Sequence, residues 1–190
     1  MSSLCDKQIV ARCRAGNESD LVFPFNENLI RPCSYDLRLG WDYKVEKKPP
    51  WWRRLLRCVE PVEPWDKQWI DKRAFNGWIV IHPGELILAS SVESVNLTGL
   101  VHGRLTGRST TGRGGLSVHL TADHIDPGYY GTVTFMIENH GCVPIKLPID
   151  TPIAQIIFEQ CDIMPDKRYG KRPDDAYQGS TGPTAALPFP

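Results

Sequence analysis

Glycine and proline interrupt this sequence every few residues, and that punctuation limits the folds open to the chain. There are 16 glycines and 16 prolines among the 190 residues. Short runs rich in β-branched and aromatic residues lie between them, at 78–81, 85–89, 100–105, 116–120, 132–137, 144–147 and 153–158. Short strands bounded by turn residues at this spacing are typical of sandwiches and barrels. The sequence therefore predicts an all-β fold.

Helix is expected in few places. Residues 6–14 (DKQIVARCR) carry apolar side chains at helical spacing, and Gly16 follows as an end signal. Residues 51–58 are a second candidate. A chain of this length can bury a core of its own. Because no internal repeat is visible, we expect one domain over residues 1–190.

Two segments differ in composition from the rest. Residues 44–73 are charged and proline-rich and hold four of the six tryptophans. We expect an insertion whose aromatic side chains pack on the barrel or on a neighbouring subunit. The alternative is that Trp51, Trp52, Arg53 and Arg54 bind a partner or stack on a nucleotide. Residues 166–190 are polar and rich in glycine and proline, which is typical either of a disordered end or of a lid that closes on a ligand.

Charge and cysteine content exclude several classes of function. The formal net charge is +0, so no overall field recruits nucleic acid, whereas a small phosphate-bearing ligand needs only a local basic site. No apolar run approaches the ~20 residues of a membrane span, and the first residues lack the apolar core of a signal peptide. We expect a cytoplasmic protein without nucleic acid or membrane partners. The six cysteines form no CxxC pair, and the zinc-deaminase pattern is missing, so any deamination would be zinc-independent.

Residues 107–141 hold most of the chemistry-bearing side chains. Arg108, Ser109 and Thr110 lie in a glycine-rich turn, where a guanidinium group and hydroxyls can hold phosphate. Asp126 leads a Pro-Gly turn and is suited to orient or deprotonate a water. Tyr129 follows this turn, where its ring can lie against a bound ligand. The alternatives are a surface ion pair for the arginine, turn stabilisation for the aspartate and packing for the tyrosine.

Six segments, in this order, resemble the motifs of the dCTP deaminase and dUTPase superfamily. They are 32–40 (PCSYDLRLG), 83–90 (PGELILAS), 107–113 (GRSTTGR), 125–131 (IDPGYYG), 152–158 (PIAQIIF) and 177–182 (YQGSTG). The resemblance covers most of the chain and is greatest to the dCTP deaminase branch. It implies a distorted, jelly-roll-like β-barrel of the dUTPase type with a short N-terminal helix. It also implies a homotrimer with three sites between neighbouring subunits.

The same resemblance implies roles for individual residues. Asp126 and Arg113 would be catalytic. The substrate, dUTP or dCTP, would be contacted by Arg108, Ser109, Thr110, Thr121, Ala122, Tyr129, Gln155, Tyr169, Tyr177, Ser180 and Thr181. Magnesium would be held mainly by the substrate phosphates, so no protein metal ligands are expected.

One position departs from the deaminase pattern. Deaminases of this superfamily carry a water-activating glutamate that an ungapped count from Gly131 places at Met136, whose thioether cannot take a proton. Glu138 points to the same face of a strand but lies ~6.6 to 7 Å further along. General-base work needs about 3 Å. Glu138 could be catalytic only if a bulge shifted the strand, and Asn139 and Gly141 are in register without one.

The tail departs in the same direction. Deaminases place a lysine before the tail tyrosine and a glutamine three residues after it, whereas this chain has Ala176 and Ser180. Residues 179–182 (GSTG) instead resemble the dUTPase tail that wraps the terminal phosphate. The favoured prediction is therefore a dUTP diphosphatase, converting dUTP and water to dUMP and diphosphate. The alternatives are a dCTP deaminase, alone or coupled to hydrolysis, and a non-catalytic nucleotide-binding regulatory protein.

Overall fold

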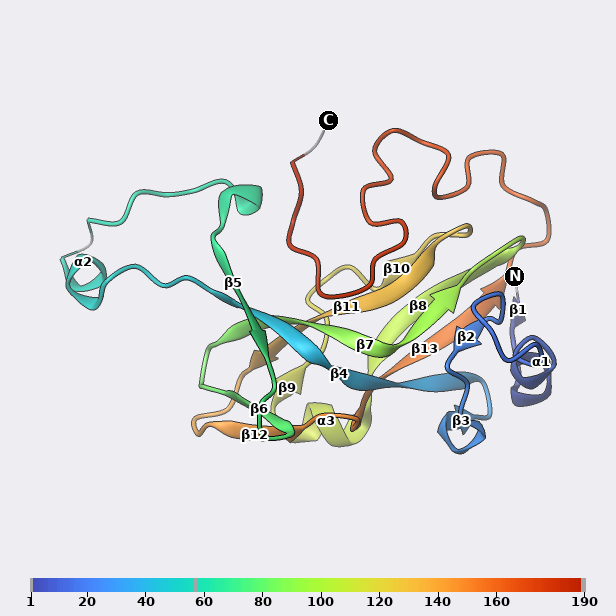
Figure 1. Ribbon diagram of the computed structural model, residues 1–190, viewed down its shortest axis with the longest axis horizontal. Helices are drawn as coiled ribbons and strands as arrows, with labels where there is room; N and C mark the ends of the chain where they lie inside the picture. Colours follow the sequence, from blue (N-terminus) through green and yellow to red (C-terminus); the bar gives the residue numbers. More distant parts are fainter. Residues whose placement is uncertain (1, 57, 189–190) are drawn as a thin grey trace.

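The computed structural model describes residues 2–56 and 58–188, so position 57 of the expected insertion and positions 189–190 of the expected lid lie outside the described residues. The predominance of strand confirms the all-β prediction (Figure 1). The elements in chain order are β1 (Ser2–Ser3), α1 (Asp6–Ala11), β2 (Val22–Phe23), η1 (Glu27–Leu29), β3 (Ile30–Arg31), β4 (Ser34–Glu46), α2 (Trp51–Leu55), η2 (Pro64–Asp66), β5 (Trp69–Arg73), β6 (Trp78–Ile81), β7 (Leu86–Asn96), β8 (Val101–Gly107), α3 (Ser109–Arg113), β9 (Leu116–Ser117), β10 (His124–Ile125), β11 (Tyr130–Asn139), β12 (Ile145–Pro148) and β13 (Pro152–Gln160).

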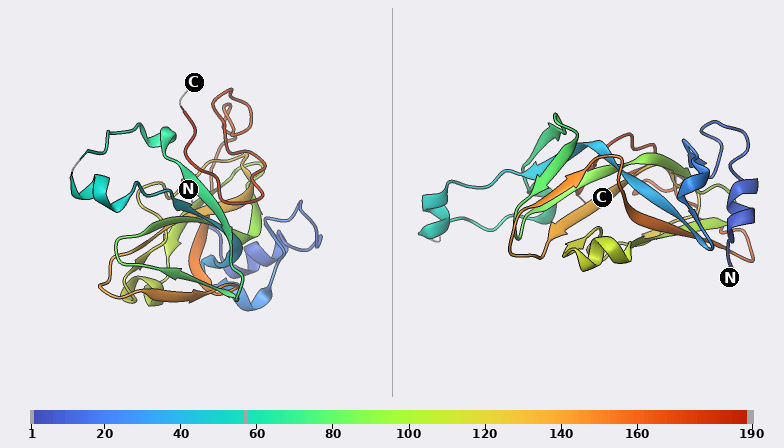
Figure 2. Two further views of the ribbon diagram at one scale, coloured as in Figure 1. Left: turned by 60° about the vertical axis from the view of Figure 1, so that its left-hand side comes forward. Right: turned by 90° about the horizontal axis from the view of Figure 1, so that it is seen from below.

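A curled sheet of 11 strands forms the body of the molecule. Its main path runs β10-β8-β13-β4-β7-β11-β9, with β1 added on β13, β2 on β7, and β3 and β5 on β4. A separate two-stranded sheet is formed by β6 and β12. Strand β4 joins the two halves of the large sheet, because its first residues pair with β13 and its later ones with β7 and β5. Figures 1 and 2 show the resulting curl.

The close approach of β4 to its neighbour β7 depends on a glycine. A Cβ on Gly40 would lie 2.8 Å from the carbonyl oxygen of Ser90 and 3.3 Å from that of Ser91. Both contacts are to backbone, which cannot rotate away as a flexible side chain would. The two strands can therefore approach this closely only because residue 40 has no side chain.

The core follows the alternation of side chains along the strands. On β11, Val133, Phe135 and Ile137 are buried, while the residues between them lie on the other face. Period-two alternation is what a strand with one core face requires. Strand β11 lies between β7 and β9 in the sheet. Its outward face is therefore flanked by other strands and can form the floor of a site.

A buried ion pair lies where β4 and β7 meet. The carboxylate of Glu93 is fully buried and accepts hydrogen bonds from the backbone nitrogen of Arg38 at 2.8 Å and from its Nε at 2.6 Å. Burial raises the pKa of Glu93, and the hydrogen bonds from Arg38 oppose that rise. The pair lets two charged residues occupy strands that otherwise carry core side chains.

Segment 44–73 differs from the expected insertion at both ends. Strands β4 and β5 pair from Asp42↔Arg73 to Glu46↔Trp69, so these ends belong to the main sheet. Residues 47–56 and 58–68 project from it (Figure 1). Trp51 and Trp52 at the tip are 75% and 45% exposed, and so do not pack on the barrel of their own chain. Packing on a neighbouring subunit or a partner stays a prediction.

Several expected boundaries were too long. Helix α1 ends at Ala11 rather than at residue 14, α2 ends at Leu55 rather than at 58, and β9 covers only Leu116–Ser117 of 116–120. After Ser117 the chain leaves the sheet and crosses to β10, which pairs with β8 instead. Other strands were underestimated, because ladder pairing continues β7 to Asn96 and β11 to Asn139.

Candidate active site

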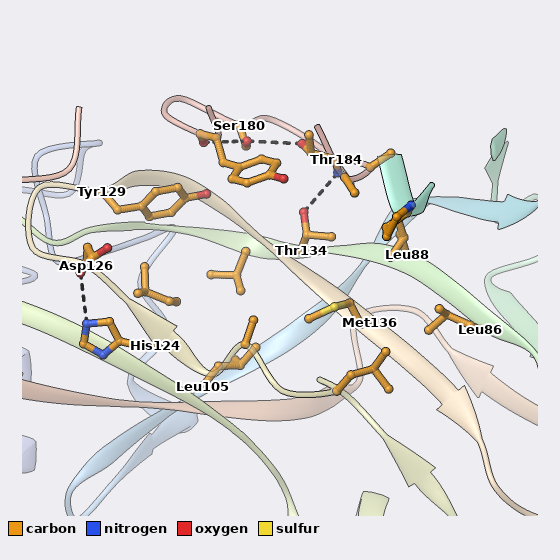
Figure 3. Close-up of a pocket in the computed structure, with 18 of the residues that line it drawn as sticks. Leu86, Leu88, Leu105, His124, Asp126, Tyr129, Thr134, Met136, Ser180 and Thr184 are labelled. Carbon is orange, nitrogen blue, oxygen red and sulfur yellow. Dashed lines mark hydrogen bonds and ion pairs between the residues drawn. The ribbon is translucent and has the colours of Figure 1, made fainter. Parts of the chain in front are cut away.

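A cavity of about 600 Å³ lies between the outward face of β11 and the C-terminal segment (Figure 3). The neighbouring strands and the base of the projecting hairpin complete its wall. The residues that line it are Pro64, Lys67, Trp69, Leu86, Leu88, Leu105, Leu120, Ala122, His124, Ile125, Asp126, Tyr129, Val133, Thr134, Met136, Tyr169, Tyr177, Ser180, Thr184, Ala185 and Ala186.

Strand β11 places Met136 in this cavity. Pairing with β7 is continuous from Thr134↔Ser90 through Met136↔Leu88 to Glu138↔Leu86, and the register shift lies before Thr134. Thr134 and Met136 line the cavity, whereas Glu138 is not among the lining residues. No bulge carries Glu138 into the position of Met136 within the described strand, so its assignment as a catalytic residue has no geometric support.

The register of β11 is held at its end by Asn139. Its buried amide nitrogen donates to the carbonyl oxygens of Ile81 and Val143, each at 2.9 Å, and its Oδ1 accepts from the backbone nitrogen of Gly141 at 2.8 Å. These bonds use both ends of the side-chain amide. A slip of one residue would break all three, which fixes Met136 on the cavity face.

Asp126 lies at the other end of the cavity, beside a histidine. Its Oδ1 is 3.2 Å from Nε2 of His124, and both side chains are about half exposed (Figure 3). Asp126 is the only carboxylate among the described lining residues. Sequence reasoning selected the aspartate but missed the histidine. The available signal was their spacing, since residues two apart in extended chain share a face.

Tyr129 forms a wall next to Asp126. Its ring is 8% exposed and meets the ring of Tyr169 edge-on, with the centroids 5.6 Å apart. Its hydroxyl donates to the carbonyl oxygen of Thr132 at 2.6 Å. Burial raises the pKa of Tyr129 to about 12, so the phenol stays neutral. The residue therefore packs in the core while presenting part of its surface to the cavity.

The C-terminal segment is held over the cavity by hydrogen bonds to β11. The backbone nitrogen of Thr132 donates to the carbonyl oxygen of Ser180 at 2.8 Å, and that of Gly179 donates to Tyr130 at 2.9 Å. The backbone nitrogen of Thr184 donates to Oγ1 of Thr134 at 3.2 Å. The segment thus covers the cavity, as a lid would.

The expected contact residues in this segment separate into two groups. Tyr169, Tyr177 and Ser180 line the cavity, while Thr181 is exposed and does not. Ala122 also lines it, whereas its neighbour Thr121 is exposed outside it. Movement of the segment on ligand binding stays a prediction.

The expected phosphate-binding residues lie elsewhere. None of the described lining residues belongs to α3, and Figures 1 and 2 place α3 and the C-terminal segment on opposite sides of the curled sheet. Arg108 precedes this helix, and its Nη1 donates to the carbonyl oxygen of Pro152 at 2.9 Å. Its Nε lies 3.5 Å from the buried carboxylate of Asp36, which also pairs with Arg31 at 2.6 Å.

The remaining members of this group are near Arg108. Ser109, Thr110 and Arg113 are exposed on α3, and Gln155 on β13 accepts from Oγ of Ser34 at 3.2 Å. Hydroxyls and guanidinium groups therefore gather at one surface, and Asp126 and Tyr129 at another. Within one chain the two halves of the expected site are apart.

Comparison with known proteins places the chain in a family. The family model described as dCTP deaminase-like matches residues 3–161. The chain belongs to the dCTP deaminase-like family. A curated protein of Methanosphaera stadtmanae named "dCTP deaminase, dUMP-forming" is 35% identical over 83% of this chain and 80% of its own length. One of Streptomyces avermitilis with the same name is 34% identical over 98% of this chain and 95% of its own.

A solved structure supports the fold of this dCTP deaminase-like chain. The crystal structure of 2′-deoxycytidine 5′-triphosphate deaminase from Agrobacterium tumefaciens matches with a TM-score of 0.60 and 20% sequence identity. The match covers 84% of this chain and 48% of that one. The expected dUTPase-like architecture is therefore confirmed at the level of the fold.

The side chains of this dCTP deaminase-like protein offer no preformed metal cage in the part described. No group of three or more His, Cys, Asp or Glu among those residues could hold a metal ion. With one carboxylate in the cavity, an ion carried by substrate phosphates is compatible with the donor set. Magnesium and independence from zinc both stay predictions. The six cysteines are free thiols, and within the described ranges no helix is long and apolar enough to span a membrane.

Proposed function

We propose that the chain binds a pyrimidine 2′-deoxynucleoside triphosphate in the cavity and hydrolyses it to the monophosphate and diphosphate. The sugar would lie against Tyr129, with Asp126 beside it and the base extending along β11 toward Met136. A cavity of about 600 Å³ is in the range of small-molecule sites, and its mostly apolar wall with a few convergent polar groups is typical of them.

The observation that carries the hydrolytic function is the placement of the ionisable groups. Asp126 is the sole carboxylate among the described residues of the cavity wall, and Met136 occupies the position expected for a deaminase glutamate. A water oriented by Asp126 would bond to the α-phosphorus as the bond from that phosphorus to the diphosphate oxygen breaks. The proton of the water would pass to the carboxylate and then to solvent.

Conversion of dCTP to dUMP is the second candidate, and the relatives favour it. Their name, "dCTP deaminase, dUMP-forming", supports deamination coupled to hydrolysis better than it supports a plain dUTP diphosphatase. Deamination requires a proton acceptor at the base end of the cavity. Met136 cannot supply one, so we propose that this chain retains the hydrolytic half of that conversion.

A complete site would need more than one copy of the chain. Helix α3, which carries Arg113, lies on the opposite side of the curled sheet from the C-terminal segment that covers the cavity (Figure 1). A nucleotide whose sugar lies at Asp126 would therefore take its phosphate contacts from another subunit. This supports the homotrimer implied by the superfamily, with each site shared between neighbours. Magnesium would arrive with the phosphates and neutralise part of their charge.

The test is to incubate the protein separately with dUTP and dCTP and to measure diphosphate and ammonia. We expect diphosphate from dUTP and no ammonia from dCTP. Rapid ammonia release would establish the deaminase instead. Binding of nucleotide without either product would favour the non-catalytic alternative.

Subunit mixing tests the shared site. Arg113→Ala and Asp126→Asn should each be inactive alone, and their mixture should recover activity at about a quarter of the sites if each site takes one residue from each of two neighbours. A mixture that stays inactive although light scattering shows mixed trimers would refute sharing. A stable monomer with full turnover would refute the trimer itself.

A further inference from the structure

His124 lies next to the proposed catalytic aspartate in a position to control it. Its Nε2 is 3.2 Å from Oδ1 of Asp126, and both side chains line the cavity (Figure 3). At this distance a hydrogen on Nε2 is attracted to the carboxylate oxygen, which can only accept. The contact engages one oxygen of Asp126 and leaves Oδ2 for other partners.

Strand β10 fixes the backbone of the histidine. His124 pairs with Arg104 and Ile125 with Gly103 on β8. Asp126 follows directly in the turn, where its carbonyl oxygen accepts from the backbone nitrogen of Tyr129 at 3.2 Å. The backbone of His124 is thus held by strand pairing and that of Asp126 by a turn hydrogen bond, and together they bring the two side chains close.

The structure assigns His124 as a positioning residue for Asp126, whose charge sets how strongly that carboxylate can accept a proton from water. This inference rests on the proposed hydrolytic function. A neutral imidazole with its hydrogen on Nε2 attracts the nearer carboxylate oxygen and so orients the carboxylate. An imidazolium adds a positive charge at the same distance, which stabilises the carboxylate and makes it a poorer base. Turnover should therefore fall as the ring gains its second proton.

Other ionisable groups surround the pair. His102 on β8 is buried with its ring centroid 5.0 Å from that of His124. Burial lowers the pKa of His102, and the nearby His124 lowers it further. The remaining charged or titratable neighbours are Arg104 on β8, Glu159 on β13, and Tyr169 and Arg172 in the C-terminal segment.

The size of the effect follows from the exposure of the pair. Two unit charges about 4 Å apart interact weakly in water and several-fold more strongly at a protein surface. Because both side chains are about half exposed, we expect a charged ring to lower kcat by roughly three- to tenfold relative to a neutral one.

Two substitutions separate orientation from charge. His124→Gln keeps an N–H donor facing Oδ1 but cannot become charged, so it should retain most of the turnover and should not lose turnover on acidification as the unmodified protein does. His124→Ala removes both functions and should lower kcat at least tenfold, with KM nearly unchanged. His140→Gln is the matched control, because that ring contacts Ser117 and does not line the cavity.

The tautomer gives a readout that does not depend on turnover. In the neutral His124 ring, nitrogen chemical shifts should show the hydrogen on Nε2 rather than on Nδ1, and Asp126→Asn should weaken that preference. The inference is overturned if turnover of His124→Gln falls on acidification as much as that of the unmodified protein. It is also overturned if turnover of the unmodified protein does not fall, or if the neutral ring carries its hydrogen on Nδ1 instead of Nε2. If neither dUTP nor dCTP is hydrolysed at any pH, the proposed function fails, and the tautomer still decides whether the pair exists.

Discussion

Replacing Gly131 with alanine should detach the C-terminal segment from the cavity while leaving the fold intact. Gly131 has φ of 136°, and a Cβ there would lie 2.8 Å from both the backbone nitrogen and the carbonyl oxygen of Ser180. These are backbone atoms, so the segment must shift as a unit. The positive φ adds a strain of about 1 to 2 kcal/mol whether the segment is docked or not.

The magnitude follows from the hydrogen bonds that the shift would break. Thr132 donates to Ser180 through its backbone nitrogen at 2.8 Å and through Oγ1 at 3.1 Å, and Gly179 donates to Tyr130 at 2.9 Å. Each such bond contributes about 1 kcal/mol net. Losing two of the three would weaken docking by about 2 kcal/mol, which raises the population of the open segment by about 30-fold.

Amide hydrogen exchange is the measurement. In Gly131→Ala the amides of Gly179 and Thr132 should exchange about 30-fold faster, whereas amides in the core of β11 should change only with global stability. Gly182→Ala is the control in the same segment, because a Cβ there meets nothing within 4 Å. Equal exchange in Gly131→Ala and the unmodified protein, or an equal change in both variants, would refute this account of how the segment is held.

Three further predictions concern the chemistry and the core. Asp126→Asn should lower diphosphate release from dUTP by on the order of 10²- to 10⁴-fold while calorimetry with a non-hydrolysable analogue shows retained binding, and full activity would remove Asp126 from the mechanism. The unmodified protein should release no ammonia from dCTP and Met136→Glu should release some; deamination that is abolished by Glu138→Gln would show that the assigned register is wrong. Glu93→Gln should lower the free energy of unfolding by about 3 kcal/mol in urea titrations, because it removes the nearer carboxylate partner of Arg38 and leaves only Asp150 at 3.7 Å, and a loss below 1 kcal/mol would contradict that role.

Much of the fold could be predicted where pattern and environment agree. β6 was predicted with its observed bounds, and the core of β11 was predicted because its side chains alternate as a strand with one buried face demands. β4 was missed. It is interrupted by charged residues and by Gly40, and its acceptability as a strand depends on Arg31 reaching Asp36 and on Glu93 reaching Arg38. Glu93 is 55 residues from Arg38 in the sequence, so this pairing cannot be inferred from the residues around β4.

In the candidate site, side-chain identity supplies the chemical groups, whereas the folding of distant segments onto one another selects which of them meet. The absence of a proton acceptor at Met136 is a property of side-chain identity and strand period, and both can be read locally. The approach of His124 to Asp126 and the docking of Ser180 on Gly131 depend on how a turn and a distant tail are placed. The separation of Arg108 from Asp126 depends on the curl of the whole sheet. The local alternation of a strand sets the face on which each side chain lies. Only the pairing of strands distant in sequence sets which side chains come together.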